Sequence, residues 1–439
     1  ILDSTLTWDH RRWRWQILIA TYFGYAGYYL TRKTYNICMK TMADEFDWNL
    51  QDAGRIWTAF LVAYMLGQFL NSFLGRKWGP RALLLGGLGL SIAINLIFGI
   101  SNSYYTFLTF MFFNGLAQAS GWPACVGGVA EWLRPSERGT IMGFWSTSYL
   151  IGNMLVKFAG GILLQHYGWR WSFFGLTLLS ALVWIIILIF QRNRPEDAGL
   201  TPIVEKTSSD NDYRAIRASQ DVHLTTRQYF ELALTPVVLT MGISYFCIKF
   251  LRYALDSWLP TFLQIQEMEP GTASYYSSIF DWAGLGGAIF AGFALDRVFR
   301  GNWAALCFTM GLGMIGSYLA VINYGTTPVA MAWCFGAVGF MVYGPDTLLC
   351  GAASVAVAGE RNGVAVAGLV NGIASIGPIV QMEIIGWLAR DDQLAGIRNT
   401  NLLTLGMSIT FTLLMIVMMW RLHVTHAGHR KRDAERSAS

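Results

Sequence analysis

Residues 15–36 read WQILIATYFGYAGYYLTRKTYN, an apolar run that ends in two adjacent cations followed by a polar stretch. A run of about 20 apolar residues is long enough to cross a bilayer as a helix. Tyr25, Tyr29 and Arg32 recur at i, i+4 and i+7, so they share one face of that helix. A cation inside an apolar helix costs about 2.5–3.5 kcal/mol on insertion scales and is by default a sign of function. This stretch therefore predicts a membrane-spanning helix with a functional polar stripe.

The composition extends this prediction to the whole chain. Of its 439 residues, 54% are hydrophobic and only 13% are charged, whereas soluble proteins carry roughly 25% charged residues. We predict an all-α membrane protein with about twelve spans in two sets of six. The first set covers residues 15–36, 54–75, 82–101, 105–132, 139–165 and 169–191, and the second covers 235–259, 272–295, 303–324, 328–358, 363–389 and 400–421.

The hydrophilic stretches divide the chain into four predicted regions. These are a first six-helix bundle (1–191), a linker (192–234), a second six-helix bundle (235–422) and a basic tail (423–439). Cations gather in alternate loops, after the second, fourth and eighth spans, and this bias predicts that both termini are cytoplasmic. The net charge of +5 follows from these membrane flanks, which indicates a positive-inside signal rather than nucleic-acid binding.

The two sets of spans carry matching landmarks. Arg32 and Arg252 are 220 residues apart (252 − 32). The other pairs are Arg76 with Arg297 at 221 (297 − 76), Pro123 with Pro345 at 222 (345 − 123) and Glu137 with Glu360 at 223 (360 − 137). Internal repeats are typical of transporters, whose substrates bind between the repeats. One arginine in each repeat predicts a site for an anion.

Each arginine also has a purely structural interpretation. Arg32 and Lys33 could cap the outer end of their helix by extending into the interface. On the seventh span Lys249, Arg252 and Asp256 lie at i, i+3 and i+7, and Asp256 could neutralise Arg252 locally. Two cations would then share one nearby anion, which leaves positive charge for a ligand.

Three more charges fall inside predicted spans, namely Lys157, Asp281 and Asp346. They could form ion pairs in the bundle interior, balance the arginines when the site is empty, or carry a coupling proton. None of the six histidines lies well inside a span, and the six cysteines form no paired motif. We expect no metal and no cofactor, and we expect the cysteines to pack in the core.

Two arginines suit a doubly charged substrate. A phosphate monoester carries nearly two negative charges at pH 7, and a planar guanidinium donates two parallel hydrogen bonds to such oxygens without deprotonating. Closing an empty carrier around uncompensated cations is costly, whereas a bound dianion cancels their charge. We therefore expect the carrier to change conformation mainly when loaded, which is the behaviour of an exchanger.

Several segments together resemble the organophosphate:phosphate antiporter family of the major facilitator superfamily. They are RRWRWQI (11–17), FGYAGYYLTRK (23–33), NGLAQ (114–118), GWP (121–123), RPEDAGL (194–200) and LRY (251–253) with Trp258. The resemblance covers about residues 10–430. It implies twelve helices in two pseudo-symmetric six-helix bundles and transport by alternating access of a small phosphorylated anion.

The resemblance also implies roles for individual residues. Arg32 and Arg252 match the phosphate-binding arginines, Asp281 matches an acidic position on the eighth span, and the pocket-lining positions are Tyr25, Tyr29, Gln118, Trp122 and Tyr343. A second-span lysine found in several members of the family is Gln68 here, and a fifth-span histidine is Tyr149. Less charge then surrounds the phosphate, unless Lys249 or Lys157 replaces it. The expected cytoplasmic gate comprises Arg76, Arg138, Asp296 and Arg297; the acid that normally precedes Arg76 is replaced by Gly75.

These features predict a multi-pass protein of the cell inner membrane that exchanges an organic phosphate for inorganic phosphate as a monomer. The substrate would be a sugar phosphate such as glucose 6-phosphate, or glycerol 3-phosphate or phosphoglycerate. Two alternatives remain: a membrane sensor of external hexose phosphate that acts with a histidine kinase, and a proton-coupled importer of a phosphonate or carboxylate. An enzyme is not expected, because no nucleophile–base pair or nucleotide motif is present.

Overall fold

The computed structural model describes residues 7–130, 132–133, 141–142, 144–145, 147–201, 203, 234–350, 353, 357 and 366–438. For residues 69, 72, 73, 75, 76, 130 and 424–438 it describes the backbone alone. Every regular element within these residues is a helix. The predicted linker falls mostly on residues 202 and 204–233, outside the described part.

Helices α1 to α9 occupy the N-terminal part of the chain. Their bounds are α1 Trp8–Arg32, α2 Thr34–Glu45, α3 Leu50–Ile100, α4 Tyr104–Gln118, α5 Gly121–Ala130, α7 Ser148–Leu155, the π-helix η1 Val156–Gly160, α8 Gly161–Tyr167 and α9 Trp169–Phe190, followed by the 3-10 turn η2 Pro195–Ala198. The C-terminal part contains α12 Pro236–Ile265, α13 Pro270–Arg297, α14 Trp303–Tyr324, α15 Pro328–Cys350, α17 Ile376–Leu388 and α18 Gln393–Ala438.

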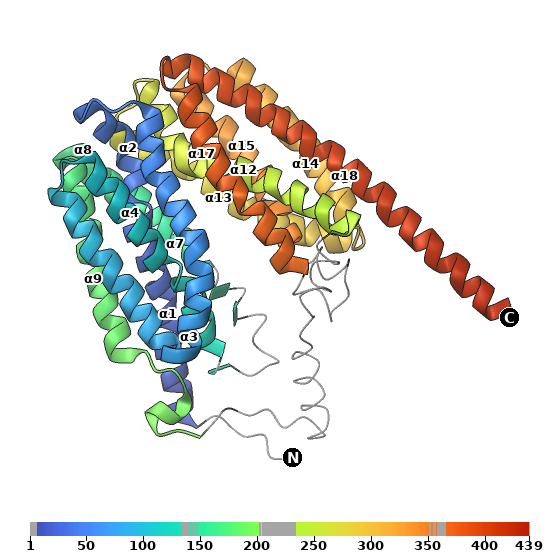
Figure 1. The fold of residues 1–439 in the computed structure, drawn as a ribbon, viewed down its shortest axis with the longest axis horizontal. Helices are drawn as coiled ribbons and strands as arrows, with labels where there is room; N and C mark the ends of the chain where they lie inside the picture. Colours follow the sequence, from blue (N-terminus) through green and yellow to red (C-terminus); the bar gives the residue numbers. More distant parts are fainter. Residues whose placement is uncertain are drawn as a thin grey trace. The chain divides into compact units, whose positions relative to one another are not determined.

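Eight of the helices in the described residues are long and apolar enough to cross a membrane. An all-helical membrane fold is thereby confirmed, and the count of twelve spans and the cytoplasmic position of both termini stay predictions. The second and third predicted spans form one element, α3, which bends at Gly79 (φ 77°) just before Pro80. The predicted last span lies within the longer α18, which Figure 1 draws in red as a single helix.

The first predicted span ends earlier than expected. Residues 15–36 were predicted as one helix, whereas α1 ends at Arg32 and α2 begins at Thr34. Lys33 separates them and donates its backbone N–H to the Tyr29 carbonyl. The break places Arg32 in the last turn of α1. The polar face of α1 that carries Arg32 therefore ends there and does not extend into α2.

The chain divides into two compact units. Unit 1 comprises residues 1–213 and 260–278, and unit 2 comprises 214–259 and 279–439. The division into two six-helix bundles, a linker and a tail stays a prediction. In unit 1, α3 contacts α4 and α9, and α1 contacts α7 and α9, so that these helices run alongside one another (Figure 1). In unit 2, α14 contacts α15 and α18.

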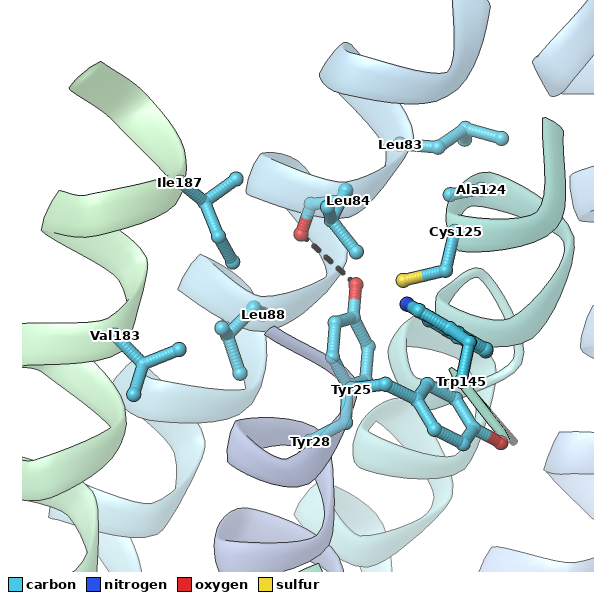
Figure 2. Close-up of a cluster of buried hydrophobic side chains, with 10 residues drawn as sticks. All are labelled: Tyr25, Tyr28, Leu83, Leu84, Leu88, Ala124, Cys125, Trp145, Val183 and Ile187. Carbon is cyan, nitrogen blue, oxygen red and sulfur yellow. Dashed lines mark hydrogen bonds between the residues drawn. The ribbon is translucent and has the colours of Figure 1, made fainter. Parts of the chain in front are cut away.

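A buried aromatic cluster fixes α1 within unit 1. Figure 2 shows Tyr25 and Tyr28 of α1 among side chains of α3, α5 and α9, together with Trp145. Tyr28 donates its hydroxyl hydrogen to the Leu84 carbonyl oxygen, 2.9 Å away, and Trp145 donates its indole N–H to Thr21 Oγ1 at 3.1 Å. Lipid leaves no water to satisfy such groups, so these hydrogen bonds complement the packing between helices.

A short break separates α4 from α5. Ala119 and Ser120 interrupt the helix between Gln118 and Gly121. Ser120 donates its hydroxyl hydrogen to the Ala117 carbonyl at 2.7 Å and lies 3.0 Å from the Tyr28 hydroxyl. The polar groups exposed by this break are therefore satisfied locally.

Glycine contacts bring the same pairs of helices together in each unit. In unit 1 a Cβ added at Gly115 of α4 would overlap the Phe60 carbonyl of α3, and one at Gly67 would meet the Leu116 carbonyl at 3.1 Å. In unit 2 a Cβ added at Gly339 of α15 would lie 2.5 Å from the Phe280 carbonyl of α13, and one at Gly287 would overlap the Phe340 carbonyl.

These four contacts reproduce the repeat in three dimensions. Gly67 and Phe60 are each 220 residues from Gly287 and Phe280 (287 − 67 and 280 − 60), and Gly115 is 224 residues from Gly339 (339 − 115). Small residues permit such close helix contacts in membranes. Two other glycines of α13, Gly286 and Gly292, make no such close contact: the nearest atom to an added Cβ is 3.7 Å away at Gly286, and none lies within 4 Å at Gly292.

Four of the six cysteines, Cys38, Cys125, Cys247 and Cys307, are buried free thiols. The expectation of core packing holds for them. It is wrong for Cys350, which is exposed, and Cys334 is half-buried.

We predict that Gly115→Ala and Gly339→Ala destabilise the protein, each by about 1–3 kcal/mol, because the methyl group meets backbone that cannot repack. Thermal unfolding of the detergent-purified protein, followed with a thiol-reactive dye that reports the buried cysteines, measures this. Gly86→Ala and Gly316→Ala are matched controls, since nothing lies within 4 Å of an added Cβ at either position. Equal melting temperatures for both pairs of variants would contradict the proposed helix contacts.

Candidate functional site

Arg32 lies at the end of α1 with only 8% of its surface exposed. Its Nε donates to Gln118 Oε1 at 3.1 Å. The guanidinium carbon lies over the rings of Tyr29 and Tyr64, at 4.7 and 4.9 Å from their centroids, and 6.0 Å from that of Phe60. An amide oxygen and three aromatic faces thus contact this cation, and its side chain packs against other helices of unit 1.

Gln118 is held in the orientation that this contact requires. Its side-chain Nε2 donates to Thr31 Oγ1 at 2.9 Å and to Ser91 Oγ at 3.1 Å. With both hydrogens of the amide directed at hydroxyl oxygens, the carbonyl oxygen is left to accept from Arg32. Because Gln118 is fully buried, this network fixes the plane of the guanidinium.

Aromatic side chains extend from Arg32 along the α1 face. Tyr29 lies 6.2 Å from Tyr149 of α7 and 5.7 Å from Tyr25, centroid to centroid. Tyr25 in turn contacts Trp122 of α5 at 5.4 Å, and Trp122 is 38% exposed. The structure therefore brings together all six positions that the sequence indicated in this repeat: Tyr25, Tyr29, Arg32, Gln118, Trp122 and Tyr149.

In unit 2, Arg252 of α12 forms an ion pair with Asp346 of α15. Its Nη1 lies 2.6 Å from Asp346 Oδ2, and the two side chains are 20% and 9% exposed. The guanidinium carbon lies 4.6 Å from the centroid of the Tyr343 ring. Asp346 is thus a partner from another helix, while Asp256 is half-buried on α12 itself.

Tyr343 connects this ion pair to a second carboxylate. Its hydroxyl donates to Asp281 Oδ1 of α13 at 3.2 Å, and Asp281 is 1% exposed. The Tyr343 ring thus contacts the Arg252 guanidinium, and its hydroxyl contacts the Asp281 carboxylate. Tyr343 therefore lies between these two charged groups. Arg252, Asp346, Tyr343 and Asp281 therefore form one cluster.

Lys249 lies one helical turn before Arg252 on α12. Its Nζ donates to Asn371 Oδ1 at 2.7 Å and to Ser375 Oγ at 3.3 Å, and it lies 5.1 Å from the Tyr245 ring centroid. Both hydrogen-bond acceptors are neutral, and Lys249 adds a cation to the same helix as Arg252.

Lys157 lies in the π-helical segment η1 and is 2% exposed. Its Nζ donates to the Ser277 carbonyl at 3.0 Å, and its own carbonyl accepts from Ser274 Oγ at 2.8 Å. The residue is therefore anchored to the first turns of α13, which belong to unit 1. π-Helical turns frequently occur at functional sites.

The expected gate residues are placed only in part. Asp296 and Arg297 are exposed at the end of α13. Arg76 belongs to α3 by its backbone, and its side chain is outside the described residues, as is the whole of Arg138. The gate stays a prediction.

Four contributors were not anticipated from the sequence. Phe60 and Tyr64 of α3 stack against Arg32, and Asn371 and Ser375 bind Lys249. Both pairs have i, i+4 spacing, which places each pair on one helix face. Gln68 lies another four residues after Tyr64, and the sequence had already indicated Gln68 as a site position. This spacing of four residues could have identified Phe60 and Tyr64.

Chemically, both arginine clusters are suited to binding an oxyanion. A guanidinium carries five N–H donors in a fixed planar fork that matches phosphate and carboxylate oxygens. Stacking against Tyr29 and Tyr64, or against Tyr343, restricts that plane while its edge remains the donating surface.

Comparison with known proteins identifies the family of this chain. The family model described as Major Facilitator Superfamily matches residues 21–382. The glycerol-3-phosphate transporter of Bacillus subtilis (strain 168) is 28% identical over 372 residues, covering 82% of each chain. The membrane sensor protein UhpC of Salmonella typhimurium (strain LT2) is 27% identical over 355 residues, covering 79% of this chain and 78% of the other.

The fold has solved counterparts as well. A bacterial homolog of the human lysosomal transporter Spinster superimposes with a TM-score of 0.75 at 14% identity, covering 92% of this chain and 97% of the other. A resemblance at this level of identity concerns the fold alone. Because the family model spans most of the sequence, this chain is a multi-pass membrane protein that belongs to the Major Facilitator Superfamily.

Proposed function

We propose that this protein is a secondary active transporter that exchanges an organic phosphate for inorganic phosphate by alternating access. We place it in the cell inner membrane and expect it to act as a monomer. Glucose 6-phosphate, glycerol 3-phosphate and phosphoglycerate are the candidate organic phosphates. The glycerol-3-phosphate transporter relative supports this substrate class.

The observation that carries the proposal is the ion pair between Arg252 and Asp346. The carboxylate accepts from Nη1 at 2.6 Å, and its other oxygen, Oδ1, is buried with no hydrogen-bond partner among the described residues. A phosphate offers the same acceptor chemistry with greater charge. We infer that Asp346 neutralises Arg252 in the empty carrier and gives way to a phosphate oxygen when substrate binds.

The surroundings of Arg32 complement this role. The Gln118 amide and the aromatic rings hold its guanidinium in a fixed orientation. A phosphate dianion matches the planar fork of N–H donors and carries more charge than a carboxylate. Binding would thus be strongest for a dianion, as an organophosphate carrier requires.

Exchange follows from the cost of uncompensated charge in a low-dielectric environment. An occupied carrier has a doubly charged anion against its arginines and can change conformation, whereas an empty one must do so with Arg252 held only by the single charge of Asp346. The carrier would therefore reorient mainly when loaded with substrate or phosphate.

A sensor is the second candidate function, favoured by the similarity to the membrane sensor protein UhpC. A sensor of an organic phosphate would use the same arginines. The two functions differ in whether binding is followed by transport across the membrane.

Phosphate exchange in proteoliposomes tests the proposed function directly. Vesicles loaded with phosphate should take up labelled phosphate from outside, and one of the three organic phosphates should block the uptake. Saturable binding without exchange would indicate a sensor. Rapid release of preloaded phosphate into a medium without counter-substrate would contradict obligatory exchange.

We predict that Arg252→Lys raises the phosphate concentration for half-maximal exchange about tenfold or more. The lysine keeps the charge but loses the planar fork, and charge-assisted hydrogen bonds contribute about 1.5–3 kcal/mol. Arg398→Lys, an exposed position on α18, is the matched control and should behave as the wild type. If Arg252→Lys were equally unaffected, Arg252 would have a structural role.

We predict that Asp346→Asn tightens phosphate binding, because the anion no longer competes with a carboxylate for Arg252. Direct binding of labelled phosphate to the purified protein should show a Kd at least several-fold lower. Asp391→Asn is the control, since Asp391 is exposed and pairs with Arg390 away from this cluster. Weaker or unchanged binding by Asp346→Asn, with a normal melting temperature, would refute the competition.

A further inference from the structure

A cavity lies on unit 1, between the start of α1 and residues 141, 144 and 145. It has a volume of about 660 Å³ and its lining combines apolar and aromatic side chains with two arginines. The lining residues are Arg11, Arg14, Trp15, Leu18, Ile19, Tyr22, Phe23, Ile141, Phe144 and Trp145. None of the residues assigned above to phosphate binding lines this cavity.

The cavity is polar at one end only. Among the described residues that line it, Arg11 and Arg14 are the cations, and they lie on the first two turns of α1. Beyond them the walls are apolar or aromatic, and several side chains are well exposed: Trp15 at 67%, Ile19 at 50%, Phe23 at 45% and Phe144 at 73%. The lining therefore matches an amphiphile with an anionic head.

The floor of the cavity is well defined. Trp145 is 1% exposed and its ring packs 5.6 Å from that of Tyr25. Tyr22 stacks with Phe144 at 6.0 Å and forms a hydrogen bond of 2.9 Å with Thr147 Oγ1. These contacts tie the two walls together, so the cavity is a built feature of unit 1.

The dimensions fit one lipid leaflet. From Arg11 to Phe23 the helix rises about 18 Å, at 1.5 Å per residue, and half of the hydrocarbon core is about 15 Å thick. The positive-inside rule predicts that this end of α1 is cytoplasmic, where anionic lipids attract basic residues near the surface. Trp15 has the amphipathic ring typical of the membrane interface.

We propose that this cavity is a binding site for an anionic phospholipid, with the headgroup phosphate on Arg11 and Arg14 and an acyl chain along Leu18, Ile19 and Phe23. A free phosphate ion would use only the two arginines and leave the apolar walls without a partner. A lipid matches both the two arginines and the apolar walls.

The test is a titration of the full-length protein in detergent with dioleoyl phosphatidylglycerol or dioleoyl phosphatidylcholine, monitored by native mass spectrometry. One phosphatidylglycerol should bind with an affinity at least about tenfold higher than phosphatidylcholine, since each basic residue near an anionic lipid contributes roughly a factor of five. The double variant Arg11→Gln/Arg14→Gln should lose this preference.

Two further variants test whether the preference for phosphatidylglycerol depends on the cavity itself or only on the positive charge at the start of α1. Arg12→Gln removes one positive charge from the same part of α1, but Arg12 stacks on Trp8 and is not among the residues that line the cavity, so the preference should persist. Ile19→Asp places a carboxylate against the proposed acyl chain and should weaken phosphatidylglycerol binding while both arginines remain.

Three results would overturn the proposal: equal binding of the two lipids by the wild type, an effect of Arg12→Gln as large as that of the double variant, or unchanged binding by Ile19→Asp. Displacement of phosphatidylglycerol by 10 mM inorganic phosphate, on the order of cellular concentrations, would assign the cations to a free ion instead. Size-exclusion profiles confirm that each variant is folded.

Discussion

The close approach of α3 to α4, and of α13 to α15, is the constraint on which both arginine clusters depend. Gly115 lets α4 lie against the Phe60 carbonyl, and Gln118 follows three residues later. Gly339 does the same for α15 against Phe280, and Tyr343 and Asp346 follow at i+4 and i+7 on the same stripe. A side chain at either glycine would separate the helices and move the partner of the arginine. In lipid, where helices gain little from the hydrophobic effect, such contacts decide the packing.

Much of this arrangement could be predicted from the sequence. The apolar runs and the repeated landmarks predicted an all-helical membrane protein built from two copies of one unit, and the residues around Arg32 were predicted from helix periodicity and family resemblance. The prediction of an all-helical membrane protein is confirmed, because a spanning segment must be apolar for about 20 residues and must satisfy its own backbone. A charge in such a segment is therefore conspicuous.

The choice of partners could not be predicted. Asp256 lies four residues from Arg252 and Asp346 lies 94 residues away (346 − 252), yet the ion pair with Asp346 is the one that crosses between helices. Periodicity specifies which face of a helix a residue occupies, but not the rotation of the neighbouring helix. The break at Lys33 was missed for a similar reason, because no proline or glycine marks it.

The two residues Ala119 and Ser120 make the two copies unequal in backbone as well as in side chains. Gly115 and Pro123 are eight residues apart (123 − 115), while Gly339 and Pro345 are six apart (345 − 339), and α15 continues through the point at which α4 ends. An ancestral duplication would thus have been followed by a change in length at the core of the membrane, a place where insertions are seldom tolerated. The hydroxyl of Ser120 contacts the Ala117 carbonyl and the Tyr28 hydroxyl. Such a change in length is tolerated because the inserted residue satisfies polar groups that the break exposes. The same inequality extends to the arginines, since a neighbouring helix offers an amide oxygen to Arg32 and a carboxylate to Arg252.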